Sequence, residues 1–156
     1  SSHPQKNRSF HYLPYHTDSS FEQRFLEEVL AMSELEQLDL EVYYNGDRVL
    51  TEFKIKCYQG NSGSWKYVGM YTPDFLILKR KGGKIYKAII VETKGAIYAN
   101  DPMFREKRFF MEREFVRQNN AKFQYQRFDY LYLEDSWPEA ERIRMTHEKI
   151  CAFFAE

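Results

Sequence analysis

Two apolar stretches in the middle of the chain are separated by a pair of glycines. Residues 73–79 and 85–93 are rich in Ile, Leu and Val, and Gly82-Gly83 lies between them. Paired glycines between two apolar runs are typical of a tight hairpin turn. The pattern therefore predicts two antiparallel strands that are buried on both faces.

The rest of the hydrophobic pattern predicts helices around these strands. We expect helices over residues 19–38, 102–117 and 138–154, strands over 51–58 and 123–133, a turn at 45–47 and a loop at 60–64. Asp101 and Pro102 are suited to the start of the second helix, as a capping residue and a first helical residue. The order α-β-β-β-α-β-α predicts an α/β (α+β) fold with a mixed sheet flanked by helices.

Composition excludes several classes of protein. The chain has 156 residues, of which 43% are hydrophobic and 17% aromatic, and this is too apolar for a disordered chain. No apolar run approaches the about 20 residues of a membrane-spanning helix, and no signal segment opens the chain. We therefore expect a cytoplasmic protein with no membrane contact. Residues 17–156 are expected to form a single domain, and residues 1–16 an N-terminal extension, a tag or linker.

Cysteine and histidine spacing gives no zinc motif of the usual kinds. The two cysteines, Cys57 and Cys151, form no C-x-x-C motif, and the four histidines form no H-x-x-x-H pair. We therefore do not expect a zinc site, and we interpret His147 as structural.

Charge is distributed unevenly along a chain whose net charge is zero. Residues 53–100 contain nine Lys and Arg against two acids, whereas residues 18–52 contain two basic residues against ten acids. The neutral total therefore conceals a strongly basic segment, which is compatible with DNA as a partner. Overall neutrality still predicts weak DNA binding by this domain alone.

Three charged residues are brought together by the predicted hairpin. With the turn at Gly82-Gly83, residue numbers of antiparallel partners sum to about 165, so Asp74 faces position 91 or 92. Lys94 follows Glu92 by two residues, so both side chains point to one face if the strand extends that far. Two carboxylates and an ammonium at one strand end are typical of a site for a divalent cation and an activated water. Solvated charges at a strand end are the alternative.

Glu22 lies within the apolar face of the first predicted helix. Measured from Phe21, the apolar residues of that helix centre near about 70°, and Glu22 falls at about 100°. A carboxylate in this position is either half of a capping box with Ser19 or a functional group. The sequence leaves these two roles open.

The charged segments resemble a nuclease signature. Pro73-Asp74, followed after 17 residues by Glu92-Thr93-Lys94, resembles the PD-(D/E)XK nuclease motif. The wider segments, residues 71–77 and 90–95, resemble the C-terminal endonuclease domain of the restriction (Res) subunit of type III restriction enzymes. The resemblance covers roughly residues 17–135 and implies a restriction-endonuclease-like αβββαβ core.

The resemblance also implies roles for individual residues. Asp74 and Glu92 would ligate Mg²⁺, for which Mn²⁺ could substitute. The backbone carbonyl of Thr93 and the carboxylate of Glu22 would add ligands, and Lys94 would position or activate the attacking water. The implied reaction is hydrolysis of a DNA phosphodiester bond.

The implied partners are DNA, a helicase/ATPase module and a methyltransferase subunit. The chain itself contains no G-x-x-x-x-G-K-[ST] motif, so an ATP-dependent motor would have to lie outside it. A non-catalytic DNA- or protein-binding module of the same fold is the alternative function.

Overall fold

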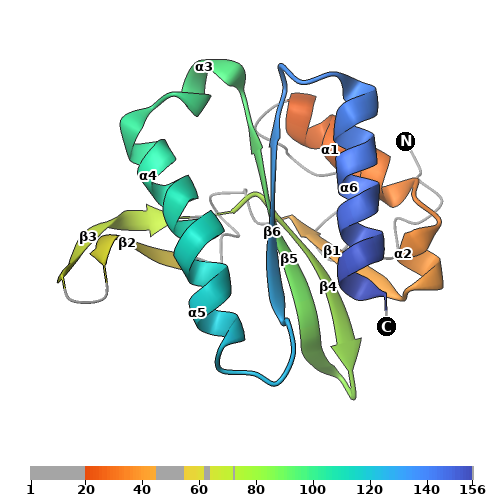
Figure 1. Cartoon of the computed structure of the whole chain (residues 1–156). Helices are drawn as coiled ribbons and strands as arrows, with labels where there is room; N and C mark the ends of the chain where they lie inside the picture. Colours follow the sequence, from red (N-terminus) through yellow and green to blue (C-terminus); the bar gives the residue numbers. More distant parts are fainter. Residues whose placement is uncertain (1–19, 45–54, 62–63, 72, 156) are drawn as a thin grey trace.

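A computed structural model describes residues 20–44, 55–61, 64–71 and 73–155 of the chain (Figure 1). In chain order its elements are α1 (Ser20–Leu30), α2 (Glu34–Gln37), β1 (Leu40–Tyr44), β2 (Ile55–Asn61), β3 (Ser64–Tyr71), β4 (Phe75–Lys81), β5 (Lys84–Lys94), α3 (Ala96–Ala99), α4 (Pro102–Phe110), the π-helical turn η2 (Met111–Phe115), α5 (Val116–Asn120), β6 (Phe128–Glu134) and α6 (Glu139–Phe154). No helix within these ranges is both long and apolar enough to cross a bilayer.

Four strands form a mixed sheet in the order β1-β4-β5-β6. β1, β4 and β5 pair antiparallel, whereas β6 runs parallel to β5. A parallel neighbour requires a long crossover, and residues 95–127 provide it through α3, α4, η2 and α5. The predicted mixed sheet flanked by helices is confirmed.

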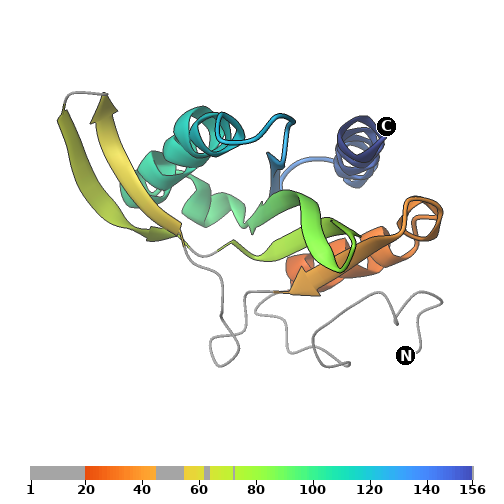
Figure 2. The ribbon, with the colours of Figure 1, turned by 90° about the horizontal axis from the view of Figure 1, so that it is seen from below.

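Buried side chains cover both faces of this sheet. Ile89 and Leu133 pack with α1 and α6 in one cluster, and Ile90 packs with Phe104 and Met111 of the α4 side in the other. Neighbouring residues of β5 thus serve opposite faces, as expected of a strand buried on both sides. Figure 2 shows α4 and α5 on one side of the sheet and α6 on the other.

The second pair of strands forms a separate sheet. β2 and β3 pair antiparallel with each other and lie beside α4 (Figure 2), and neither belongs to the four-stranded sheet. The strand predicted over 51–58 is observed from Ile55 onward as part of β2, and residues 51–54 lie outside the described residues. The prediction of a loop over 60–64 was wrong at both ends, because Asn61 pairs with Ser64. Backbone pairing here overrides the weak strand propensity of small polar residues.

The first predicted helix is broken, and a strand follows it that the sequence did not predict. Helix α1 ends at Leu30 rather than at 38, and α2 is a separate short helix whose N-cap is Ser33. Asp39 then adopts a left-handed backbone conformation with φ of 55°, which Asp tolerates better than most residues, and the chain turns into β1. The predicted turn at 45–47 lies outside the described residues.

The later elements differ from prediction mainly at their ends. The helical segment that begins at Pro102 continues to Asn120, past the expected end at 117. Strand β6 begins at Phe128 rather than at 123, because the Asn120 side chain accepts hydrogen bonds from the backbone N–H groups of Arg127 and Phe128 and closes the preceding turn. Helix α6 begins at Glu139, one residue after the expected start.

Candidate active site

The β4–β5 hairpin places Asp74 beside Glu92. Gly82 and Gly83 form its turn with φ of 58° and 77°, in the left-handed region that favours glycine. Phe75 pairs with Val91, so the next position along the pair joins Asp74 to Glu92. The backbone N–H of Asp74 donates to the carbonyl of Val91 at 3.1 Å. The structure therefore brings the two carboxylates together as the hairpin arithmetic predicts.

The carboxylate of Asp74 is held by its cross-strand neighbour. The backbone N–H of Thr93 donates to Asp74 Oδ2 at 2.8 Å, and the Thr93 hydroxyl donates to the same oxygen at 2.9 Å. Two donors on one oxygen fix the orientation of the carboxylate and leave its second oxygen directed elsewhere.

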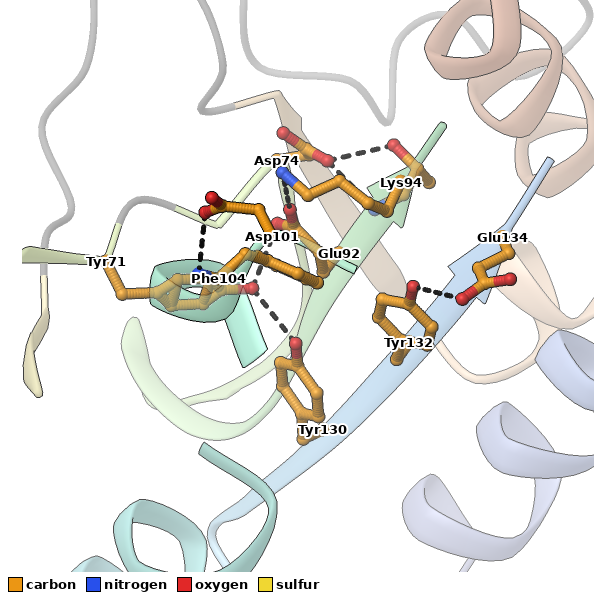
Figure 3. Close-up of polar contacts among 10 residues, drawn as sticks. Tyr71, Asp74, Glu92, Lys94, Asp101, Phe104, Tyr130, Tyr132 and Glu134 are labelled. Carbon is orange, nitrogen blue, oxygen red and sulfur yellow. Dashed lines mark hydrogen bonds and ion pairs between the residues drawn. The ribbon is translucent and has the colours of Figure 1, made fainter. Parts of the chain in front are cut away.

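Glu92 is buried and contacts two donors of different kinds. The Tyr71 hydroxyl donates to Glu92 Oε2 at 2.9 Å, and Lys94 Nζ lies 3.3 Å from Glu92 Oε1 (Figure 3). The Tyr71 hydroxyl is also 3.2 Å from the hydroxyl of Tyr130 on β6. A chain of polar contacts thus leads from β6 through β3 to the carboxylate.

Lys94 is the last residue of β5 and lines a cavity. Its ammonium is 4.2 Å from the centre of the Phe104 ring. The cavity has a volume of about 500 Å³ and is lined by Lys94, Tyr98, Asn100, Asp101 and Phe104. Because β5 extends as far as Lys94, the predicted placement of Glu92 and Lys94 on one face is confirmed.

Glu22 approaches the same acidic cluster from α1. It is 7% exposed, and its Oε2 accepts a hydrogen bond from the Tyr44 hydroxyl at 3.0 Å. Its charge also acts on Asp74 and Glu92, which places it near both. Ser19 lies outside the described residues, so the capping role of Glu22 stays a prediction.

The carboxylates perturb one another. Burial raises the pKa of Asp74 well above its ordinary value, and the charges of Glu92 and Glu22 raise it further. Burial also raises the pKa of Glu92 to about 7, although Lys94 and the Tyr71 hydroxyl act in the opposite direction. Carboxylates gathered beside the ammonium of Lys94 form an electrostatically unfavourable group in the absence of a further cation.

The donor set suits a hard divalent cation. Asp74, Glu92 and Glu22 offer carboxylate oxygens, which Mg²⁺ and Mn²⁺ prefer. Both hydrogen bonds from Thr93 go to Asp74 Oδ2, which leaves Oδ1 for a cation, and Glu92 Oε2 keeps a second lone pair beside the hydrogen bond from Tyr71. A divalent charge among these groups would also offset the burial and the repulsion that raise the pKa values of Asp74 and Glu92. The role of the Thr93 carbonyl as a ligand stays a prediction.

Two hydrogen bonds to the acids of the candidate site could not be predicted from the sequence. Tyr44 and Tyr71 each donate a hydroxyl hydrogen bond to one of the acids. Tyr71 lies two residues before Pro73 and is the end of β3, a strand that was not predicted, and Tyr44 ends β1, which was not predicted either. If these two strands had been predicted, their ends would have placed the two tyrosines near the acids.

Comparison of the chain with protein-family models, curated proteins and solved structures gives no significant match. The functional interpretation therefore depends on the geometry of the site and on the sequence motif.

Proposed function

We propose that the chain is a Mg²⁺-dependent DNA endonuclease domain of the PD-(D/E)XK type, the nuclease part of a type III restriction-like enzyme. One observation carries the proposal. Asp74 and Glu92 lie side by side at the end of two buried strands, with Glu22 close by and Lys94 3.3 Å from Glu92. Glu22 and Glu92 are buried, and charged groups are rarely buried close together without a ligand or a chemical role.

The order of the elements around the site also supports the proposal. Elements α1, β1, β4, β5, α4 and β6 follow one another as α-β-β-β-α-β, and the three antiparallel strands and one parallel strand lie in one sheet. The β2–β3 hairpin is inserted between the first and second strands of that sheet. This is the order that the nuclease resemblance implies, with this hairpin and the short helices α2 and α3 added to it.

The acidic residues would hold the cation. Asp74 and Glu92 are the principal ligands in this proposal, with Glu22 as an additional one. When bound, Mg²⁺ would supply charge stabilisation for the phosphoryl group during hydrolysis. The hydrogen bonds from Thr93 and Tyr71 keep the two principal carboxylates in place before substrate arrives, which lowers the reorganisation that binding requires.

Lys94 would act on the substrate. Lys94 lines the cavity, and its ammonium could donate hydrogen bonds to a non-bridging phosphate oxygen and orient the attacking water. Water adds to phosphorus, and the bond from phosphorus to the leaving oxygen of the DNA strand breaks. The positive charge of Lys94 offsets the negative charge that develops on the phosphate oxygens.

The wider assignment extends the same proposal. A helicase/ATPase module and a methyltransferase subunit would bring DNA to this domain, in the cytoplasm. The basic excess of residues 53–100, which include β2 to β5, lies on the segment that carries Asp74 and Glu92. This charge would favour approach of the DNA backbone without giving tight binding by itself.

Cleavage of supercoiled plasmid tests the proposal. The parent chain is compared with Asp74→Ala and Lys94→Ala, with and without Mg²⁺. We expect Mg²⁺-dependent nicking by the parent and a loss of roughly 100-fold or more in both variants, because Asp74→Ala removes a metal ligand and Lys94→Ala removes the positive charge that faces the phosphate. Lys84→Ala removes an exposed lysine from the other end of β5 and is the matched control, which should cleave like the parent.

The outcomes separate the candidate functions. Undiminished cleavage by either site variant would contradict the assignment of its residue. If the parent binds DNA but does not cleave it with Mg²⁺ or Mn²⁺, the non-catalytic binding module of the same fold is the better description.

A further inference from the structure

A second group of metal-ligating side chains lies between α2 and α6. It consists of Glu34 from the first turn of α2, and His147 and Cys151 from α6. His147 and Cys151 are four residues apart, so they share one face of the helix. One ligand atom from each of the three residues lies within 4.8 Å of the other two. A search for C-x-x-C and H-x-x-x-H motifs misses this group, because it pairs a histidine with a cysteine and takes its third member from a distant segment.

The distances within the group approach those of a zinc site. His147 Nε2 lies 2.8 Å from Glu34 Oε1 and 3.7 Å from Cys151 Sγ. With Zn–S of about 2.3 Å and Zn–N of about 2.0–2.1 Å, tetrahedral coordination puts sulfur and nitrogen about 3.6 Å apart. The Glu34 oxygen would move about half an ångström away from the imidazole to make room. A rotation of the exposed His147 ring or of the carboxylate suffices for that.

Neither a simple ion pair nor a catalytic triad accounts for all three side chains. An ion pair between Glu34 and His147 explains their contact but gives no role to Cys151. A Cys-His-Glu catalytic triad requires the thiol and the carboxylate to contact different ring nitrogens. Here both contact Nε2, and the three ligand atoms lie within 4.8 Å of one another, as the ligands of a common ion do.

We propose that Glu34, His147 and Cys151 form a Zn²⁺ site that fastens α6 to α2. Thiolate, imidazole and carboxylate are the three ligand types that Zn²⁺ accepts together, whereas Mg²⁺ prefers oxygen alone. Three protein ligands leave a fourth tetrahedral position for water. Helix α3 follows Lys94, at the end of β5 that carries the acidic cluster. In Figure 1, α2 and the C-terminal end of α6 lie at the opposite end of the molecule from α3, so the zinc site is separate from that cluster.

Binding would change the protonation of two ligands. Cys151 coordinates as a thiolate, and its proton passes to solvent. His147 coordinates through Nε2 as a neutral imidazole, with its remaining proton on Nδ1. Zinc affinity should therefore fall as the pH is lowered.

Titration with Co²⁺, a spectroscopic probe for zinc sites, tests the proposal on the full chain. We expect a thiolate-to-cobalt charge-transfer band in the near ultraviolet that saturates at one equivalent and is displaced by Zn²⁺. Cys151→Ser should abolish the band, and His147→Ala should weaken binding at least tenfold. Glu36→Gln, which alters an exposed acid of the same helix, should leave the titration unchanged. Circular dichroism confirms that each variant is folded.

Thermal unfolding gives a second readout. In an excess of Mg²⁺, which would occupy the carboxylates of the candidate active site, Zn²⁺ should raise the Tm of the parent and of Glu92→Gln, which lacks one of those carboxylates, but not of Cys151→Ser. The proposal is overturned if the folded parent shows no charge-transfer band, or if Cys151→Ser retains the band and the Tm shift. Because Glu92→Gln tests the other site, failure of the nuclease proposal and failure of the zinc proposal give different results.

Discussion

Thr93 illustrates how a single uncharged residue holds a carboxylate in one orientation. Its backbone N–H and its hydroxyl both donate to Asp74 Oδ2, at 2.8 and 2.9 Å. Hydrogen bonds to the ionised form favour that form, so they oppose the effects of burial and of Glu92 on the pKa of Asp74. Thr93 therefore acts on the site through Asp74, as a positioning residue.

Substitution of Thr93 by Val tests this role at the scale of one hydroxyl. The change preserves the shape of the side chain and the backbone donor but removes one hydrogen bond to an ionised group. Such a bond contributes about 1.5–3 kcal/mol, so we expect plasmid cleavage to slow by roughly 10- to 100-fold. The Mg²⁺ concentration needed for half-maximal cleavage should rise as well.

Thr93→Ser is the matched control, because it retains the hydroxyl. It should recover most of the activity and the parent dependence on Mg²⁺. Equal loss in the Ser and Val variants would mean that packing by the methyl group matters and that the hydroxyl does not.

At the residue scale, the part of the site within one hairpin could be predicted from the sequence. The positions of Asp74, Glu92 and Lys94 follow from one turn and from strand periodicity, both of which are local. The hydroxyl donors Tyr44 and Tyr71 could not be predicted, because they lie on strands that the sequence pattern did not reveal. Each donates to an acid far away in the chain: Tyr44 to Glu22, 22 residues away, and Tyr71 to Glu92, 21 residues away.

At the scale of elements, the start of α4 connects the helix to the site. Asp101 caps α4, and its Oδ2 accepts a hydrogen bond from the N–H of Phe104 at 3.0 Å. The ring of Phe104 in turn packs against the ammonium of Lys94 and lines the same cavity. The predicted cap is thus confirmed, and it fixes a ring that contacts Lys94.

Asp101→Ala should therefore weaken both the helix and the site. Loss of an N-cap side chain costs about 1 kcal/mol, which lowers the Tm of a domain of this size by roughly 3 °C. We expect a smaller loss of cleavage than in Lys94→Ala, because Lys94 itself is retained. Asp101→Asn keeps an oxygen acceptor and should stay close to the parent in Tm. If Asn and Ala lower Tm equally, the charge of Asp101 matters more than the hydrogen bond.

The sequence predicted some elements better than others for physical reasons. The β4–β5 hairpin was predicted with its turn because paired glycines with positive φ are a local signal. The break after α1 was missed because the apolar period continues through Met32 and Leu35, both of which are buried. Strand β1 was missed because its five residues follow a helix directly, and only pairing with β4 reveals it.

At the scale of the whole molecule, the zero net charge conceals a division between basic and acidic segments. Residues 53–100 carry nine basic residues against two acids, and both acids belong to the candidate active site. Residues 18–52 carry ten acids and include Glu22 and Glu34. The excess of positive charge thus lies on β2 to β5, which would face DNA in the proposed function, and the segment of α1 to β1 is acidic.

The acidic cluster also links the stability of the whole molecule to pH. In the metal-free protein, burial raises the pKa of Glu92 from its ordinary value of 4.5 to about 7, and that of Asp74 is raised too. A raised pKa means that the folded state holds the proton more tightly than the unfolded state. The stabilisation from protonation is therefore complete below about pH 4.5 and is lost as the pH rises through 7. For Glu92 the loss amounts to at most roughly 3 kcal/mol.

We accordingly expect the Tm of the metal-free protein to fall between about pH 5 and pH 8, and Mg²⁺ to raise Tm at the higher pH much more than at the lower. Thermal unfolding in a chelator and in Mg²⁺ measures both effects. Residue 92 of Glu92→Gln cannot ionise, so the Tm of this variant should depend less steeply on pH and respond less to Mg²⁺.

Glu36→Gln is the control, because it removes an exposed carboxyl and should keep the dependence of Tm on pH that the parent shows. If the Tm of Glu92→Gln depended on pH as steeply as that of the parent, the pH dependence would originate elsewhere. If the slope were flattened in Glu92→Gln but Mg²⁺ did not raise the Tm of the parent, the carboxylates would have perturbed pKa values without binding the cation.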